Sequence, residues 1–151
     1  MVVGFDLVNE EDYNEGLDSF LDLFMEYKQR LGDKLQFFFH AGESYSKKNK
    51  EIYDAVLLGT KRIGHGLALA KSPLMIDLVK KNNICLEVCP VSNRILGYVG
   101  DLRCHPARGL ISRGVKISIN PDDQGFFDAK GVTLDYILVY LAWGLDLADL
   151  H

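Results

Sequence analysis

The sequence predicts an α/β fold, and three observations support this prediction. Short runs of β-branched and aromatic residues alternate with longer segments whose apolar residues recur at a helical spacing. The short runs are almost continuously apolar, as expected of parallel strands that helices cover on both faces. The chain of 151 residues is 48% apolar and 25% charged, which is the composition of a globular domain. No linker rich in proline, glycine and serine divides it, so residues 1–151 are expected to form one domain or part of one.

Five strands are predicted, one at each strongly apolar run. A segment of helical period follows each run, so the strands would lie parallel, with a helix in each connection. The predicted strands are VVGFDLV (2–8), LQFFFHAG (35–42), KRIGHGLAL (61–69), ICLEVCPVS (84–92) and VKISINP (115–121).

Helices are predicted between and after these strands. Gly32 and Gly114 stand where two helices would end, because glycine readily takes the positive φ of a helix C-terminus. Ser72 and Pro73 suit an N-cap and a first helical residue, and the last helix is expected from about Thr133. The apolar positions expected to form the buried helix faces are Leu17, Phe20, Leu21, Phe24, Met25, Leu31, Ile52, Val56, Leu57, Leu74, Leu78, Val79, Leu134, Ile137, Leu138 and Leu141.

The charge balance and the cysteines argue against several classes of protein. The formal charge is −4 and the pI is about 5.5, so there is no basic excess for nucleic acid. No apolar run reaches the ~20 residues of a membrane span, and the first residues lack the pattern of a secretory signal. Cys85, Cys89 and Cys104 are odd in number without a CxxC spacing, which predicts neither a disulfide framework nor a thiolate zinc site. We interpret them as small buried hydrophobic residues, and the lysine-rich stretch 47–50 as a solvated loop.

Polar side chains fall where the predicted strands end. His40 and Glu43 close the second strand, and His65 lies at the end of the third. Asp122 and Asp123 follow the fifth. In a β/α barrel the active site is assembled at the carboxyl ends of the strands, from several different loops. We therefore expect these five residues to share one site.

These residue types suggest metal-assisted hydrolysis. One imidazole and one carboxylate suit Zn²⁺, which in catalytic sites leaves a position open for water. A second imidazole would orient or deprotonate that water, and Glu43 would protonate the leaving group. Taken singly, His40 or His65 is more often a structural histidine, and the NPDD stretch is ordinarily a turn. Chance is a weaker explanation for several strand ends that all carry such groups than for one. We assign His105 and His151 no functional role.

Four motifs resemble the adenosine deaminase family, in order and in spacing: HAGES, RIGHGLAL, LEVCPVSN and SINPDD. The longer stretches RIGHGLALAKSP, EVCPVSNRILGYVGDLRCHP and DDQGFFDAKGVTLDY look like its secreted branch, the adenosine deaminase-like growth factors. The resemblance implies a metal-dependent-hydrolase-type TIM (β/α)8 barrel with one Zn²⁺ per complete active site. It also implies hydrolytic deamination of adenosine, and of 2′-deoxyadenosine, to inosine and ammonia.

Carried over residue by residue, the resemblance gives each strand-end group a role. His40 and Asp122 would be zinc ligands. Glu43 would protonate the purine ring nitrogen N1, and His65 would position the attacking water and help to deprotonate it. Asp123 would hydrogen-bond to purine N7.

Three departures from the family pattern stand out. Asn9 occupies the place of a glycine whose backbone amide meets purine N3, and its added Cβ would approach the base. Gln124 stands where proline is usual. The HxH pair of zinc ligands on the family's first strand has no counterpart among residues 1–151. Because a barrel of this kind takes ~250 residues, the chain is expected to be the C-terminal part of the domain, with about strands 4–8.

Two hypotheses of different classes follow from this resemblance. The first is a zinc-dependent adenosine deaminase, extracellular by resemblance although this chain shows no signal peptide. Its partners would be adenosine or deoxyadenosine, with a homodimer in the full-length family and neither nucleic acid nor membrane. The alternative is a truncated, inactive protein that acts only by binding a nucleoside or a partner chain. A related deaminase acting on adenine or a nucleotide fits the growth-factor-like stretches less well.

Overall fold

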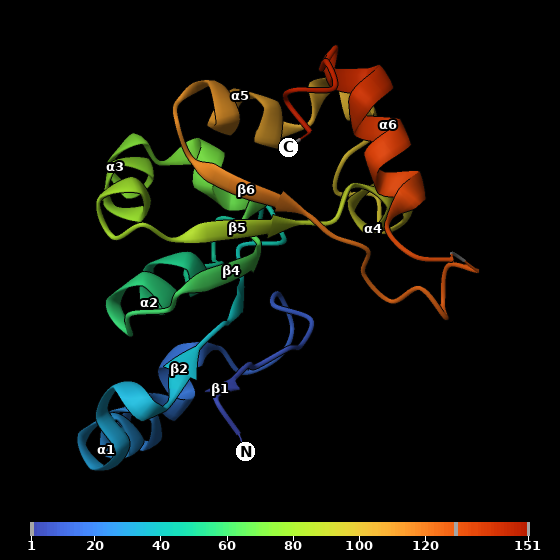
Figure 1. Cartoon of the computed structure of the whole chain (residues 1–151). Helices are drawn as coiled ribbons and strands as arrows, with labels where there is room; N and C mark the ends of the chain where they lie inside the picture. Colours follow the sequence, from blue (N-terminus) through green and yellow to red (C-terminus); the bar gives the residue numbers. More distant parts are fainter. Residues whose placement is uncertain (1, 129, 151) are drawn as a thin grey trace.

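Parallel strands form the centre of the molecule in a computed structural model that describes residues 2–128 and 130–150 (Figure 1). They pair in the orders β1-β2 and β3-β4-β5-β6, and every pair is parallel. The arrowheads of β4, β5 and β6 point the same way, toward the side where the loop after β6 leaves the sheet (Figure 1). The strands are β1 (Gly4–Phe5), β2 (Gln36–Phe37), β3 (His40–Ala41), β4 (Arg62–His65), β5 (Cys85–Val88) and β6 (Lys116–Ile119).

The second predicted strand is interrupted, and it appears as β2 and β3 with Phe38 and Phe39 between them. Hydrogen bonds continue across the interruption. The amide of Phe38 donates to the carbonyl of Phe5 at 3.0 Å, and the amide of Gly64 donates to that of Phe39 at 3.0 Å. The two sheets are thus connected through one stretch of chain, and the strands follow one another in sequence order.

The first strand is shorter than predicted because a side chain replaces its backbone as hydrogen-bond acceptor. The amide of His40 donates to Oδ1 of Asp6 at 3.0 Å, beyond the last backbone pair with Phe5. The parallel ladder therefore ends one residue before Asp6, and that carboxylate lies beside His40.

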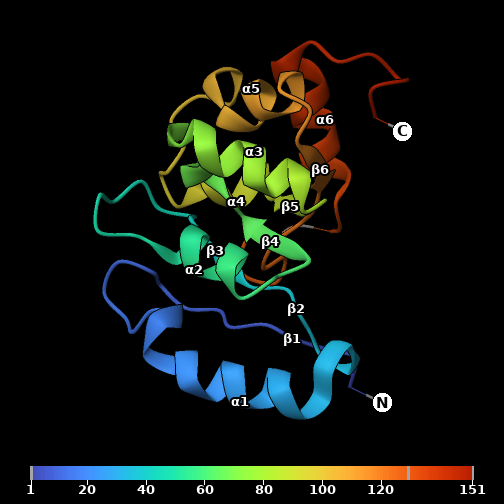
Figure 2. The same cartoon turned by 90° about the vertical axis from the view of Figure 1, so that its left-hand side faces the viewer.

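Helices surround the strands, and Figure 2 shows the turns of α1, α2, α3 and α5 facing the viewer. The prediction that residues 84–92 form a strand throughout was wrong. The strand ends at Val88 and a helix begins at Pro90, a residue suited to the first helical position because it lacks an amide hydrogen. The helices are α1 (Leu21–Leu31), α2 (Glu51–Leu57), α3 (Pro73–Lys81), α4 (Pro90–Ile95), α5 (Pro106–Ser112) and α6 (Thr133–Trp143). Short 3₁₀ turns are η1 (Leu17–Phe20), η2 (Gly32–Lys34), η3 (Leu67–Lys71) and η4 (Leu102–Cys104).

The predicted helix ends agree with the structure. Gly32 follows α1 with φ of 54°, and Gly114 follows α5 with φ of 81°. Ser72 occupies the N-cap position of α3, ahead of Pro73, although its side chain makes no capping hydrogen bond within the described residues. The last predicted helix begins at Thr133, as α6 does.

The predicted helix faces were wrong in several places. Leu57, Leu74 and Leu141 are 81%, 70% and 71% exposed. The buried residues of these helices sit on a neighbouring stripe, such as Ile76 in α3 and Val139 in α6. A helix that is apolar on more than one side does not reveal from its sequence which side meets the sheet. The other predicted face residues found exposed are Leu21, Met25, Leu31, Leu134 and Ile137.

An aromatic cluster joins α1 to the first strands. The ring of Phe24 lies 5.5 Å from that of Phe37 and 5.1 Å from that of Phe39, measured between centroids. The rings of Phe5 and Phe20 lie 6.0 and 6.3 Å away. These separations suit tilted and edge-to-face aromatic pairs, so the cluster fixes α1 against β1 and β2. No helix in the described part of the chain is long and apolar enough to cross a membrane.

Replacing Phe24 with alanine should lower the free energy of unfolding by about 3–5 kcal/mol, because it removes the ring at the centre of this cluster. Urea titration followed by circular dichroism measures the change. Leu57→Ala is the matched control, since Leu57 is 81% exposed and its truncation should change stability by less than about 0.5 kcal/mol. Similar losses for both variants would show that the cluster does not anchor α1.

Candidate active site

The residues predicted at the strand ends come together. His40 lies in β3, His65 is the last residue of β4, and Asp122 follows β6. The His40 and His65 rings are 5.2 Å apart, and Nε2 of His65 lies 3.8 Å from Oδ2 of Asp122. Of these three residues, His40 and Asp122 line a hollow of about 420 Å³, here called the strand-end pocket, whereas His65 does not. It is lined by Val8, His40, Gly64, Glu87, Cys89, Asn120, Pro121, Asp122 and Asp123.

A glycine in the neighbouring strand makes room for the His40 ring. A Cβ on Gly64 would lie 2.9 Å from Cγ of His40 and 3.1 Å from its Nδ1, closer than side chains pack. Gly64, the first glycine of the GHG stretch, therefore leaves the space that the His40 ring occupies.

Asp6 holds His40 from the opposite side, and the sequence analysis missed it. Its Oδ2 lies 2.8 Å from Nδ1 of His40, and its Oδ1 accepts the backbone amide. Burial alone would lower the pKa of His40, but the hydrogen bond and charge of Asp6 hold it above its ordinary value. A carboxylate behind an imidazole is the usual support of a metal-binding histidine. The available signal was an acidic residue inside the apolar run VVGFDLV.

His65 is buried and its backbone is strained. Its φ is 63° and that of Gly66 is 66°, so two consecutive residues take the left-handed conformation where β4 ends. For a non-glycine residue this geometry is uncommon and concentrates at functional sites. Burial, with a further contribution from His40, lowers the pKa of His65 to about 4. The ring is thus neutral near pH 7.

Glu43 combines burial with an unpaired oxygen. Its Oε1 lies 3.4 Å from Nδ1 of His65 and has no hydrogen-bond partner among the described residues. Burial and the neighbouring charges of Glu11 and Asp122 raise its pKa to about 7. Glu11 also fixes the backbone here, because its carboxylate accepts the amide of Glu43 at 3.0 Å. The carboxyl group can therefore hold a proton near neutral pH and donate it.

Of the two predicted substrate-binding residues, Asp123 lines the pocket and the side chain of Asn9 does not. Asp123 lines the strand-end pocket together with Asp122. The side chain of Asn9 is exposed and donates to the carbonyl of Glu15 at 3.0 Å, while Val8 lines the pocket. The contact predicted for Asn9 was through its backbone amide, so its side chain turning away leaves that prediction standing.

The cysteines fit their interpretation only in part. Cys89 is buried, but Cys85 is half-buried and Cys104 is exposed, and all three are free thiols. Cys89 also offers its sulfur within 4.8 Å of ligand atoms of His65 and Asp122. Burial raises the pKa of its thiol, so the metal-binding thiolate form is disfavoured.

The donor set of the pocket fits part of a zinc site. His40 supplies an imidazole and Asp122 a carboxylate, both of the kinds that Zn²⁺ binds. Catalytic zinc sites usually have three protein ligands. His40 and Asp122 therefore make up an incomplete set, and further ligands are needed to complete it.

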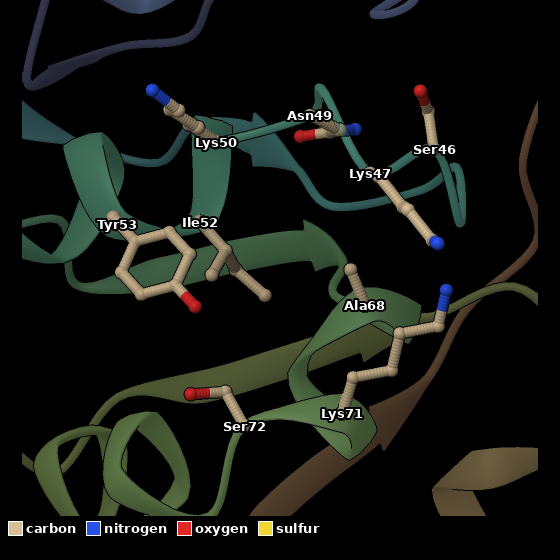
Figure 3. Close-up of a pocket in the computed structure, with 9 residues that line it drawn as sticks. All are labelled: Ser46, Lys47, Asn49, Lys50, Ile52, Tyr53, Ala68, Lys71 and Ser72. Atoms are coloured by element: carbon tan, nitrogen blue, oxygen red, sulfur yellow. The ribbon is translucent and has the colours of Figure 1, made fainter.

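A separate hollow of about 460 Å³ is lined by none of the residues predicted for the site. Figure 3 shows Ile52 and Ala68 toward its middle, with Lys47, Lys50 and Lys71 around them. The ammonium group of Lys71 is already engaged, because it donates to the carbonyl of Tyr45 at 2.8 Å. The chemistry-bearing groups are at the strand ends instead.

Histidine and carboxylate side chains gathered at the carboxyl ends of parallel strands are typical of an enzyme active site on a β/α fold. The chain belongs to the adenosine deaminase family, whose family model, described as adenosine deaminase, matches residues 1–151. Adenosine deaminase 2 of Dictyostelium discoideum is 47% identical over 98% of this chain. Human adenosine deaminase 2 is 41% identical over 100% of it. The chain spans 28% and 30% of the length of these relatives.

Solved structures show the same fold at lower identity. The adenine deaminase of Arthrobacter aurescens gives a TM-score of 0.84 at 23% identity, covering 98% of this chain and 43% of that one. The N6-methyl-AMP deaminase of Arabidopsis thaliana gives 0.81 at 23%, with coverage of 99% and 42%. A zinc-bound amidohydrolase from Burkholderia ambifaria gives 0.79 at 20%, with coverage of 97% and 39%. The described strands and helices thus match a part of each of these folds.

Gly64→Ala should displace the His40 ring and lower the free energy of unfolding by about 1–3 kcal/mol, because the new methyl group overpacks a ring held by Asp6. Urea titration gives the stability and the imidazole NMR signals report the ring. Gly109→Ala is the control: Gly109 lies in α5 with nothing within 4 Å of its Cβ position. It should gain up to about 1 kcal/mol. An unshifted His40 signal in the Gly64 variant would contradict the packing argument.

Glu43→Gln should change stability in a pH-dependent way. Because the pKa of Glu43 is raised from 4.5 to about 7, the native chain should lose stability as pH rises between these values. The glutamine variant lacks this charge, so it should be the more stable protein above pH 7, by on the order of 2 kcal/mol, and should match the native chain at low pH. Urea titrations at both pH extremes measure the difference. Glu15→Gln, at an exposed carboxylate, should show no such contrast.

Proposed function

We propose that residues 1–151 are the C-terminal part of a zinc-dependent deaminase β/α barrel, corresponding to about strands 4–8 of eight. The proposed reaction is hydrolysis of adenosine and 2′-deoxyadenosine to inosine and ammonia. Support comes from family membership and from relatives named adenosine deaminase 2. The proposed protein is extracellular and homodimeric by the same analogy.

The observation that carries the proposal is the position of the proton-holding Glu43 next to His65. Glu43 holds a proton near neutral pH, and its buried Oε1 lacks a hydrogen-bond partner among the described residues. A purine ring nitrogen is such a partner, because it gains a proton when water adds to the neighbouring carbon. Protonation by a positioned acid speeds such an addition by about 10²–10⁴-fold.

The resemblance to the family also implies roles for the other residues. His65 positions the attacking water and helps to remove its proton. Asp123, on the rim of the strand-end pocket, hydrogen-bonds to purine N7, and the backbone amide of Asn9 meets purine N3. Adding water to the ring and expelling ammonia then requires only proton transfers among these groups.

His40 and Asp122 would hold Zn²⁺, with Asp6 orienting the imidazole. When bound, the metal acidifies the water that becomes the nucleophile. We propose that an HxH pair outside residues 1–151 supplies the remaining ligands.

The alternative proposal is an inactive chain that binds a nucleoside or a partner chain. It is favoured by the incomplete ligand set, since residues 1–151 contain no HxH pair. Such a chain would keep the pocket and its proton donor without supporting hydrolysis.

Zinc content and inosine formation from adenosine, measured first on the 151-residue chain, separate these proposals. We expect weak zinc binding and no turnover from this chain. Tight zinc binding and inosine formation should appear when the chain is joined to the N-terminal part of the Dictyostelium relative. In that completed protein, Glu43→Gln should keep zinc and lower kcat by about 10²-fold or more, because the proton donor is lost while the ligands stay.

Glu15→Gln in the completed protein is the matched control and should leave kcat unchanged. Zinc binding without any deamination of adenosine, adenine or adenosine monophosphate would support the alternative. Deamination of adenine or the nucleotide in preference to adenosine would overturn the proposed substrate.

A further inference from the structure

A buried chain of hydrogen bonds runs from His65 away from the strand-end pocket. Nδ2 of Asn93 lies 3.2 Å from Nδ1 of His65, and Oδ1 of Asn93 lies 3.2 Å from Nε2 of His105. The exposed fractions of these three residues are 2%, 0% and 2%. His65, Asn93 and His105 are here called the relay. The roles already proposed for Glu43, His65 and the aspartates do not account for Asn93 or His105.

The far end of the relay is fixed by the start of a helix. His105 is the N-cap of α5, and its Nδ1 accepts the backbone amide of Ala107 at 3.1 Å. The ring packs against Trp143 of α6 at 5.3 Å, and the indole of Trp143 donates to the carbonyl of Leu102. His105 is therefore held by two helices.

The direction of each hydrogen bond follows from this anchor. A backbone amide can only donate, so Nδ1 of His105 carries no hydrogen and the remaining proton sits on Nε2. That N–H donates to Oδ1 of Asn93, which leaves the amide NH₂ of Asn93 to donate to His65. Burial lowers the pKa of His105 to about 4, which agrees with a neutral ring.

We propose that Asn93 and His105 are positioning residues that fix the tautomer of His65, with its hydrogen on Nε2. This proposal rests on the proposed deaminase function and refines the role of His65 in it. Nε2 faces Asp122 at 3.8 Å, so His65 presents an N–H rather than a lone pair to this pocket-lining carboxylate. It then acts as a hydrogen-bond donor that holds the water beside Asp122, and the proton of the water passes to the Asp122 carboxylate.

Glu43 is the competing neighbour, because its Oε1 lies 3.4 Å from the same Nδ1 of His65. If Glu43 set the tautomer by accepting a hydrogen bond, the hydrogen would be on Nδ1. The shorter contact to Asn93 and the absence of any hydrogen bond at Oε1 among the described residues favour the relay.

The test measures tautomers directly. In ¹⁵N-labelled chain of residues 1–151, long-range proton–nitrogen correlation spectra distinguish protonated from bare ring nitrogens. His→Gln substitutions assign the signals. The unaltered chain should show the hydrogen on Nε2 in both His65 and His105. A hydrogen on Nδ1 of His65 in the unaltered chain would overturn the proposal.

Asn93→Asp sharpens the test, because a carboxylate accepts at both ends of the relay. His105 should keep its hydrogen on Nε2, whereas His65 should change to mainly Nδ1–H. Asn82→Asp adds the same charge at an exposed position and should leave both rings unchanged. A folded Asn93 variant with an unchanged His65 tautomer would also overturn the proposal.

Activity separates this inference from the proposed function. In the completed protein, Asn93→Asp should lower kcat by roughly 10²–10⁴-fold with little change in KM, as a wrong histidine tautomer does in other hydrolases. If the unaltered completed protein binds no zinc and forms no inosine, the proposed function fails while the tautomers can still be as stated. If it is active and His65 carries its hydrogen on Nδ1, the positioning inference alone fails.

Discussion

The hydrogen bonds between Asp6 and His40 are the constraint on which the candidate site depends. One carboxylate accepts both the backbone amide and the ring of His40, so it ends β1 and orients the imidazole at once. The interrupted second strand lies at the same point, and the missing Cβ of Gly64 leaves the ring space on the other side. The end of β1 and the orientation of His40 therefore depend on the same carboxylate. A change that lengthened β1 by one residue pair would remove the support of His40.

Burial shifts the pKa values of Glu43 and His65 in opposite directions. The pKa of Glu43 is raised to about 7 and that of His65 is lowered to about 4. Between these values the carboxyl group carries a proton and the imidazole is neutral, although the free residues would show the reverse order. Environments that separate two pKa values in this way are typical of acid–base catalytic sites. Glu43 can thus offer a proton beside a neutral His65.

The sequence was sufficient for the parts that follow from local rules. The apolar runs, the glycines after α1 and α5, and the start of α6 at Thr133 agree with the structure. So does the gathering of His40, His65 and Asp122 at strand ends. Asp6 could not be found this way, because its role comes from pairing with a residue 34 positions along the chain. Which side of α6 is buried was equally hidden, since Leu141 and Val139 differ only in what lies next to them.

His105 shows how a structural residue can acquire chemical consequences. Nothing in the sequence distinguished it from any other histidine before a proline, and its N-cap hydrogen bond is an ordinary helix start. That bond nevertheless determines which ring nitrogen carries a hydrogen, and through Asn93 it reaches the ring that faces Asp122. Because α5 and α6 hold His105 on two sides, the outer helices contribute to the proton pattern of the site as well as to its cover. A substitution at Trp143, remote from the pocket in sequence, would therefore act on His65 through this buried connection.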